Sequence, residues 1–165
     1  MISANDRSAI EAQLDRPIRG ALAVAHRCAC GQPNVVLTAP RLEDGTPFPT
    51  SFYLTCPKLT GAVGTLEANG VMRELQDELE TDPELASAYR GAHEHYLATR
   101  EALGDVPEIA GISAGGMPNR VKCLHVLVAH SLAAGPGVNP LGDRVLAMLG
   151  DWLNGSTCAG AEKCE

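Results

Sequence analysis

Apolar side chains recur at helical spacing near the start of the chain. Ile10 and Leu14 lie four residues apart, so both face the same side of a helix. Ser3 or Asn5 can cap the start of this helix, and Pro17 closes it. The pattern predicts a short N-terminal helix.

The next part of the chain has the pattern of β-strands. Three short segments rich in β-branched and aromatic residues, 18–26, 34–42 and 51–55, are separated by turn sequences at 30–33 and 43–47. Short turns join strands that pair antiparallel with their neighbours. These segments therefore predict a three-stranded antiparallel meander.

Helical spacing of the apolar positions returns after the third strand. Helix-breaking glycines and prolines place the boundaries, and Asp82 before Pro83 supplies an N-cap for the longest helix. The predicted helices begin at Pro57, near Met72, at Pro83, at Pro118 and at Pro140. The one that begins at Pro118 is predicted to end near Ala134.

Together the patterns predict an α+β fold. It consists of a short N-terminal helix, a three-stranded antiparallel meander, and four to five helices packed on one face of the meander. Residues 1–153 are expected to form a single domain, and residues 154–165 a flexible tail.

Composition and charge exclude several classes of function. The 165 residues are 45% hydrophobic, which suits one domain with a core, and the net charge of −7 argues against a nucleic-acid or membrane-surface binder. The acidic excess is concentrated between Glu67 and Glu108, which predicts a solvated acidic helical layer. The N-terminus lacks the apolar segment of a secretory signal, and the longest apolar stretch, 121–134, is shorter than the roughly 20 residues of a membrane-spanning helix. We expect a cytoplasmic protein.

Six cysteines in such a protein favour metal ligands or reduced thiols over disulfides. Cys28, Cys56 and Cys123 stand at the ends of predicted elements, and Cys30 can complete a set of four sulfurs. Four thiolates suit zinc or an iron–sulfur cluster. The spacing lacks the paired Cys-x2-Cys knuckles of a zinc ribbon, so buried thiols that act as small hydrophobes are the alternative. The remaining pair, Cys158 and Cys164, is expected to lie exposed in the tail.

The predicted helix from Pro118 to Ala134 restricts the partners of Cys123. His130 lies on nearly the same helical face but about 10 Å further along the axis, which is too far for one metal ion. His125 faces about 200° away from Cys123. The co-ligands of Cys123 are therefore expected from the strand layer, and neither histidine is assigned to the metal.

The same helix start is a candidate anion site. A glycine turn, Gly115-Gly116, leads into the predicted helix N-terminus, which carries Arg120 and Lys122. Unpaired backbone N–H groups and the helix dipole attract anions there. A phosphate or carboxylate ligand is therefore a hypothesis, with a plain structural turn as its alternative.

A polar and aromatic stripe follows the longest predicted helix at spacings of four, three and four residues. Its members are Tyr89, His93, Tyr96 and Arg100. Such a stripe either forms the wall of a cleft or packs inward with its polar tips hydrogen-bonded, and the second arrangement is the more common.

Motifs spread over most of the chain carry a resemblance to a known family. They are Arg27-Cys28, Ala39-Pro40-Arg41-Leu42, Asp44-Gly45-Thr46-Pro47-Phe48-Pro49-Thr50, Leu54-Thr55-Cys56-Pro57, Leu66-Glu67-Ala68, Ala92-His93-Glu94, Gly115 to His125, His130-Ser131-Leu132-Ala133 and Gly137 to Asp143. Over residues 21–152 the sequence resembles the DUF501 family of bacterial, mostly actinobacterial proteins. The family has no established activity, and its members look like small cytoplasmic proteins.

The resemblance implies a particular set of site residues. The family pattern centres on Cys28, Cys56 and Cys123, whereas Cys30 is particular to this chain. Three sulfurs would leave an open metal position, which Cys30 can close. An anion pocket next to the metal would be formed by Arg27, Arg120, Lys122, His125 and His130.

Two hypotheses of different classes follow. In the first, the protein binds zinc or an iron–sulfur cluster beside a basic pocket for a small phosphorylated or carboxylated ligand. In the second, it is a non-enzymatic interaction module with buried thiols, whose acidic helical face between Glu67 and Glu108 docks a basic protein partner. Whether the protein is an enzyme, and its oligomeric state, stay open; an unpaired strand edge would favour dimers.

Overall fold

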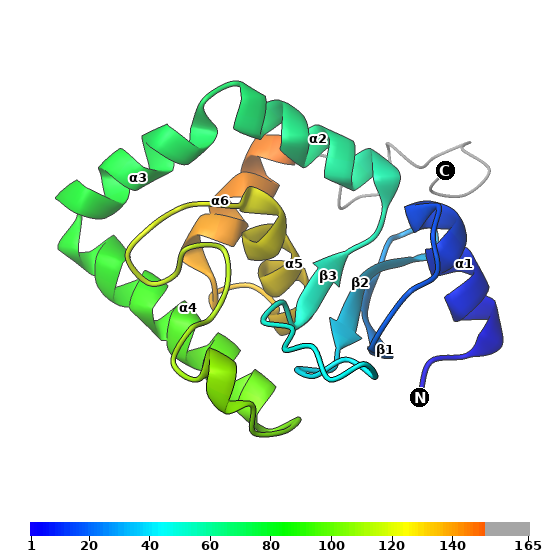
Figure 1. The fold of residues 1–165 in the computed structure, drawn as a ribbon. Helices are drawn as coiled ribbons and strands as arrows, with labels where there is room; N and C mark the ends of the chain where they lie inside the picture. Colours follow the sequence, from blue (N-terminus) through cyan, green and yellow to red (C-terminus); the bar gives the residue numbers. More distant parts are fainter. Residues whose placement is uncertain (151–165) are drawn as a thin grey trace.

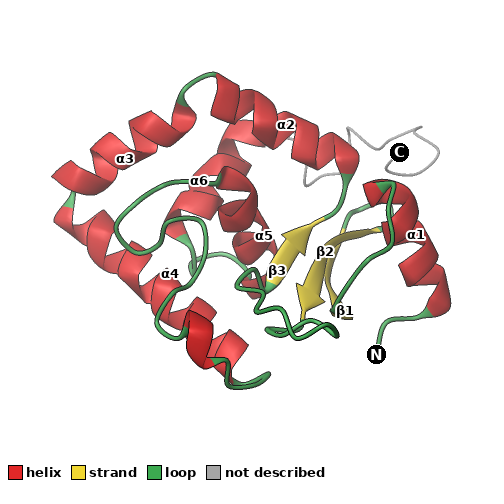
Figure 2. Ribbon diagram, in the orientation of Figure 1, coloured by secondary structure: helices red, strands yellow, loops and turns green. Residues whose placement is uncertain are grey.

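The helices and strands follow one another in the order that the hydrophobic pattern predicts (Figure 2). The structure is a computed structural model that describes residues 1–150, so the predicted boundary at residue 153 and the tail lie outside the described residues. None of its helices is both long and apolar enough to cross a bilayer. The elements are α1 (Ala4–Leu14), β1 (Ala21–Arg27), β2 (Pro33–Thr38), β3 (Phe52–Leu54), α2 (Pro57–Ala68), α3 (Val71–Thr81), α4 (Pro83–Glu101), the 3-10 helix η1 (Pro107–Ile109), α5 (Leu124–Ala134) and α6 (Pro140–Leu149).

The sheet separates two cores of unequal size. Its strands pair antiparallel in the order β1-β2-β3, which confirms the predicted meander. Side chains of successive strand residues point to opposite faces, so Val36 packs with Ile10 and Ile18 beneath α1, while Val35 joins the main core with the later helices. Figure 1 shows α1 on one side of the sheet and the other helices gathered on its opposite side.

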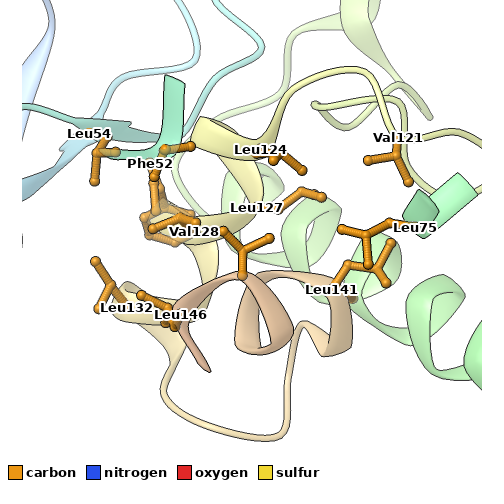
Figure 3. Packing of buried hydrophobic residues seen from close by; sticks show 14 of the residues in the cluster. Phe52, Leu54, Leu75, Val121, Leu124, Leu127, Val128, Leu132, Leu141 and Leu146 are labelled. Carbon is orange, nitrogen blue, oxygen red and sulfur yellow. The ribbon is translucent and has the colours of Figure 1, made fainter. Parts of the chain in front are cut away.

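Helix α5 lies at the centre of the main core (Figure 3). It is apolar nearly all round, and this pattern is typical of a helix surrounded by other elements. Leu127 and Val128 face neighbouring elements without exposure to solvent. Helix α6 approaches α5 at Gly142, where an added Cβ would lie 2.2 Å from the carbonyl oxygen of Leu127. Only glycine permits this contact.

The polar and aromatic stripe on α4 packs inward, as the more common arrangement predicts. Tyr89 and Tyr96 are fully buried, and Arg100 is 3% exposed. The Tyr96 hydroxyl accepts a hydrogen bond from the backbone N–H of Ser51, and the Tyr89 hydroxyl donates to the carbonyl of Arg120. The stripe holds the long loops of the protein against α4.

The predicted start of the helix at Pro118 is wrong, because α5 begins at Leu124. The backbone groups between these residues are bound by side chains from other elements. Gln76 accepts the N–H of Val121, and Tyr89 donates to the Arg120 carbonyl. These tertiary hydrogen bonds replace the helical ones, so residues 118–123 form a non-helical strap across α3 and α4.

Candidate metal centre

Three side chains with metal-binding atoms meet where α2 and α5 pack together. Glu67 belongs to the last turn of α2, Cys123 is the N-cap residue of α5, and His125 lies in the first turn of α5. One ligand atom from each of the three lies within 4.8 Å of the other two. Among residues 1–150 this is the one group of three or more such side chains that satisfies that distance.

Hydrogen bonds to the backbone fix the carboxylate of this group. The first N–H groups of a helix lack partners within the helix. Instead, Oε1 of Glu67 accepts the N–H of Leu124 at 2.9 Å. The same oxygen lies 3.1 Å from Nδ1 of His125. Glu67 therefore joins α2 to the start of α5.

The imidazole of His125 is oriented from its far side. Its Nε2 lies 3.0 Å from the carbonyl oxygen of Thr60, which can only accept a hydrogen bond. Nε2 therefore carries a proton, and Nδ1 is the atom that points toward Glu67 and Cys123. Metal-bound histidines are held in this way, with the second ring nitrogen donating to a carbonyl or carboxylate.

The electrostatics of the group favour a thiolate beside a charged imidazole. Burial opposes ionisation of Cys123, but the hydrogen bond to His125 and the backbone N–H of Val126 hold the pKa of the thiol below its ordinary value. The contact with Cys123, opposed by burial and supported by the Thr60 carbonyl and Glu67, raises the pKa of His125 to about 9. The thiol is thus prepared for its metal-binding form, whereas His125 must lose the proton on Nδ1 before it can bind a metal.

The group differs from the predicted ligand set in the partners of Cys123. They are a glutamate from α2 and the histidine two residues further along, not residues of the strand layer. The predicted angle of about 200° between Cys123 and His125 is wrong, because Cys123 lies outside the helix in extended conformation. The direction of its side chain therefore does not follow the 100° per residue of a helix, which the prediction assumed.

The other three predicted sulfur ligands do not belong to this group. Cys28 follows β1, Cys30 lies in the turn between β1 and β2, and Cys56 is the N-cap residue of α2. Cys28 and Cys56 are buried in the main core, and Cys30 packs against it. Their role as metal ligands stays a prediction.

The residues predicted to form the anion pocket lie in different places. Arg27 forms a bidentate ion pair with Asp6 of α1. His130 is fully buried in the core, and His125 belongs to the group with Cys123. Arg120 and Lys122 lie on the non-helical strap, before the N-cap residue of α5, and line a groove beside α3.

Glu67 is the site residue that the sequence pattern missed. Glu67 lies in the acidic region that was predicted to be a solvated helical face, and it is separated from His125 by 58 positions in the sequence. The acidic side chains of α3, such as Glu74 and Asp77, are exposed as predicted. The motif Leu66-Glu67-Ala68, which contributes to the family resemblance, is the one signal that marks Glu67.

Comparison with known proteins places these residues inside a family region. The family model described as "Protein of unknown function (DUF501)" matches residues 24–147, which include the whole Glu67–Cys123–His125 group. No curated protein and no solved structure matches the chain.

Proposed function

The chain belongs to the DUF501 family, and we propose that it binds one zinc ion through Glu67, Cys123 and His125. The observation that carries this proposal is the convergence of carboxylate, thiol and imidazole atoms within 4.8 Å of one another. These are the three side-chain types that bind zinc in proteins. They come from two elements that the packing of α2 on α5 already holds together.

The surroundings of the three side chains support a metal site. Thr60 fixes the tautomer of His125, and the N–H of Leu124 orients Glu67, so two of the three ligands have the outer contacts that metal ligands usually have. The half-buried positions of Glu67 and His125 limit competition from water. Three protein ligands leave a fourth zinc position open to an exchangeable ligand, as in reactive zinc centres.

The donor set favours zinc over an iron–sulfur cluster. Clusters are held mainly by cysteine thiolates, and the described group contains one sulfur. A mixed set of sulfur, nitrogen and oxygen donors suits a borderline ion that accepts all three. A bound zinc ion would replace the proton on Nδ1 of His125 and would compensate the negative charges of Cys123 and Glu67.

The test compares the ligands with matched residues outside the group. The wild type and the variants Cys123→Ser, His125→Gln and Glu67→Gln are loaded with zinc, dialysed and assayed for metal content. Zinc affinity is then measured by competition with a chromophoric chelator, and cobalt substitution reports a metal–thiolate band. The controls are Cys30→Ser, another half-buried thiol, and Glu74→Gln, an exposed carboxylate on α3.

The proposal predicts one zinc per wild-type chain and a cobalt–thiolate band that disappears in Cys123→Ser. Loss of an outer contact alone weakens metal binding by about 10- to 100-fold, so Cys123→Ser and His125→Gln should each weaken it at least about 100-fold. Glu67→Gln retains an oxygen and should have a smaller effect, while both controls should bind as the wild type does. A wild type that binds no zinc, or an equal loss in Cys30→Ser, contradicts the proposal.

A further inference from the structure

A separate groove lies between α3 and the non-helical strap of residues 118–123. It is open to solvent and has a volume of about 870 Å³, within the range of small-molecule sites, about 300–1,000 Å³. Its lining contains none of the three proposed zinc ligands, so ligand binding in this groove can be tested separately from zinc binding. The groove is lined by Met72, Arg73, Gln76, Glu80, Asn119, Arg120, Val121 and Lys122.

The lining of the groove is positive although the protein as a whole is acidic. Arg73 projects from α3, and Arg120 and Lys122 project from the strap, so cations line both walls. Glu80 is the one acidic residue in the lining, and its carboxylate accepts a hydrogen bond from the Gln76 side chain. Three positive charges thus face one negative charge, in a chain whose net charge is −7.

The cations of the groove differ from most others in the protein. Within residues 1–150, Arg73, Arg120 and Lys122 form neither an ion pair nor a side-chain hydrogen bond, and all three are exposed. Elsewhere within residues 1–150, Arg16 and Arg100 donate to uncharged oxygens, Lys58 and Arg90 form no ion pair, and five cations pair with carboxylates. These pairs are Arg7–Glu11, Arg19–Asp44, Arg27–Asp6, Arg41–Glu108 and Arg144–Glu78.

The backbone that carries the cations is held in place from both sides. Oε1 of Gln76 accepts the N–H of Val121 at 2.9 Å, and Nε2 of Gln76 donates to the carbonyl of Asn119 at 3.2 Å. On the α4 side, the Tyr89 hydroxyl donates to the Arg120 carbonyl at 2.9 Å. The strap is therefore preorganised, so that a ligand would need to order only the cationic ends of the side chains.

We propose that this groove binds a small molecule that carries two or more phosphate groups. Two guanidinium groups offer planar pairs of N–H donors that match phosphate oxygens, and the ammonium of Lys122 adds a third cation. The walls place these donors on opposite sides of the ligand, while Met72 and Val121 provide an apolar surface between them. In a protein with a negative net charge, an anion is attracted chiefly to places where unpaired positive charges lie close together.

The test measures the binding of inorganic pyrophosphate by calorimetry at low ionic strength. The protein is first dialysed against a chelator, so that zinc bound at the proposed metal site does not contribute. After this treatment, Arg73→Gln, Arg120→Gln and Lys122→Gln are compared with Lys58→Gln, which removes an unpaired cation at the start of α2, outside the groove. Thermal unfolding confirms that each variant is folded, and citrate replaces pyrophosphate in a parallel titration.

The proposal predicts binding that weakens roughly tenfold in each groove variant, the typical effect of one charge-assisted hydrogen bond. Lys58→Gln should change the affinity less than twofold, and higher salt should weaken binding. Absence of pyrophosphate binding, or an equal loss in Lys58→Gln, overturns the site. Citrate binding as tight as that of pyrophosphate overturns the assignment to phosphate.

Discussion

Acidification should destabilise the protein through His130, which is fully buried on α5. The side chain of Asn139 holds this imidazole neutral. Its Oδ1 accepts the N–H of Gly142 at 3.0 Å, so its amide group must donate to Nδ1 of His130 at 3.1 Å. Nε2 of His130 then carries the proton and donates to Nδ1 of His95 at 2.9 Å. A second proton on Nδ1 would face the amide donor of Asn139.

The expected loss of stability follows from the pKa of His130. Burial, with a smaller contribution from His95, lowers this pKa from 6.5 to about 4. In the unfolded chain the imidazole takes up a proton near pH 6.5, so its contribution to stability is present above that pH and is lost as the pH falls toward 4. Linkage gives a loss of about 1 kcal/mol at pH 5.5 and about 2–3 kcal/mol at pH 4.5, relative to neutral pH.

The assay is urea unfolding of the wild type and His130→Gln between pH 7.5 and 4.5. Gln can accept from Asn139 and donate to His95 but does not titrate, so the other ionisable groups contribute equally to both proteins. The difference between the two free energies of unfolding should shrink by about 2–3 kcal/mol from pH 7.5 to 4.5. Parallel curves for the two proteins would show that His130 is protonated equally in both states, and the reasoning would be refuted.

Three further predictions concern packing, burial and the proposed zinc site. Gly142→Ala should destabilise the protein by about 1–3 kcal/mol in urea unfolding, because its Cβ would overlap the Leu127 carbonyl; Gly91→Ala, at a helical position with no atom within 4 Å of an added Cβ, should stabilise it by up to about 1 kcal/mol. If both substitutions changed the free energy of unfolding in the same direction, the packing of α6 on α5 would be contradicted. Arg100→Met should cost about 2–4 kcal/mol in the same assay, since the buried guanidinium donates to the carbonyls of Pro49, Ile109 and Ile112; an unchanged stability would contradict this role. Zinc affinity should rise about tenfold per pH unit between pH 6 and 8, because zinc displaces a proton from His125, whose pKa lies at about 9; a pH-independent affinity would show that His125 is not a ligand.

The fold was largely predictable because its elements are specified locally. Asp82 accepts the N–H groups of Glu84 and Leu85, as its position before Pro83 predicts. The end of α2 near Asn69-Gly70 likewise follows from local backbone preference, since Gly70 has a φ of 85°. Each of these signals lies within a few residues of the boundary that it sets.

The site was less predictable because its residues are joined only by tertiary packing. Nothing in the spacing of Glu67 distinguishes it from the exposed acidic residues that follow on α3. Its position depends on how α2 crosses the start of α5, and a hydrophobic pattern reports that the two helices are buried but not where they cross. The sequence pattern also did not indicate Arg73 as a groove residue. The other two cations of the groove, Arg120 and Lys122, lie more than forty residues further along the chain.

Most differences between the predicted and the observed site follow from where α5 begins. Gly-rich turns followed by Pro118 and an apolar run favour a helix start at the proline, which would place Cys123 inside the helix. The competing interactions came from Gln76, Tyr89 and Glu67, which bind the backbone of residues 120–124 and delay the helix to Leu124. With Cys123 at the N-cap instead of inside the helix, its sulfur lies beside His125, and the two cations before it line a groove instead of a helix terminus. Glu67 therefore belongs to the proposed zinc site, while Gln76 and Tyr89 hold the strap that lines the proposed phosphate groove.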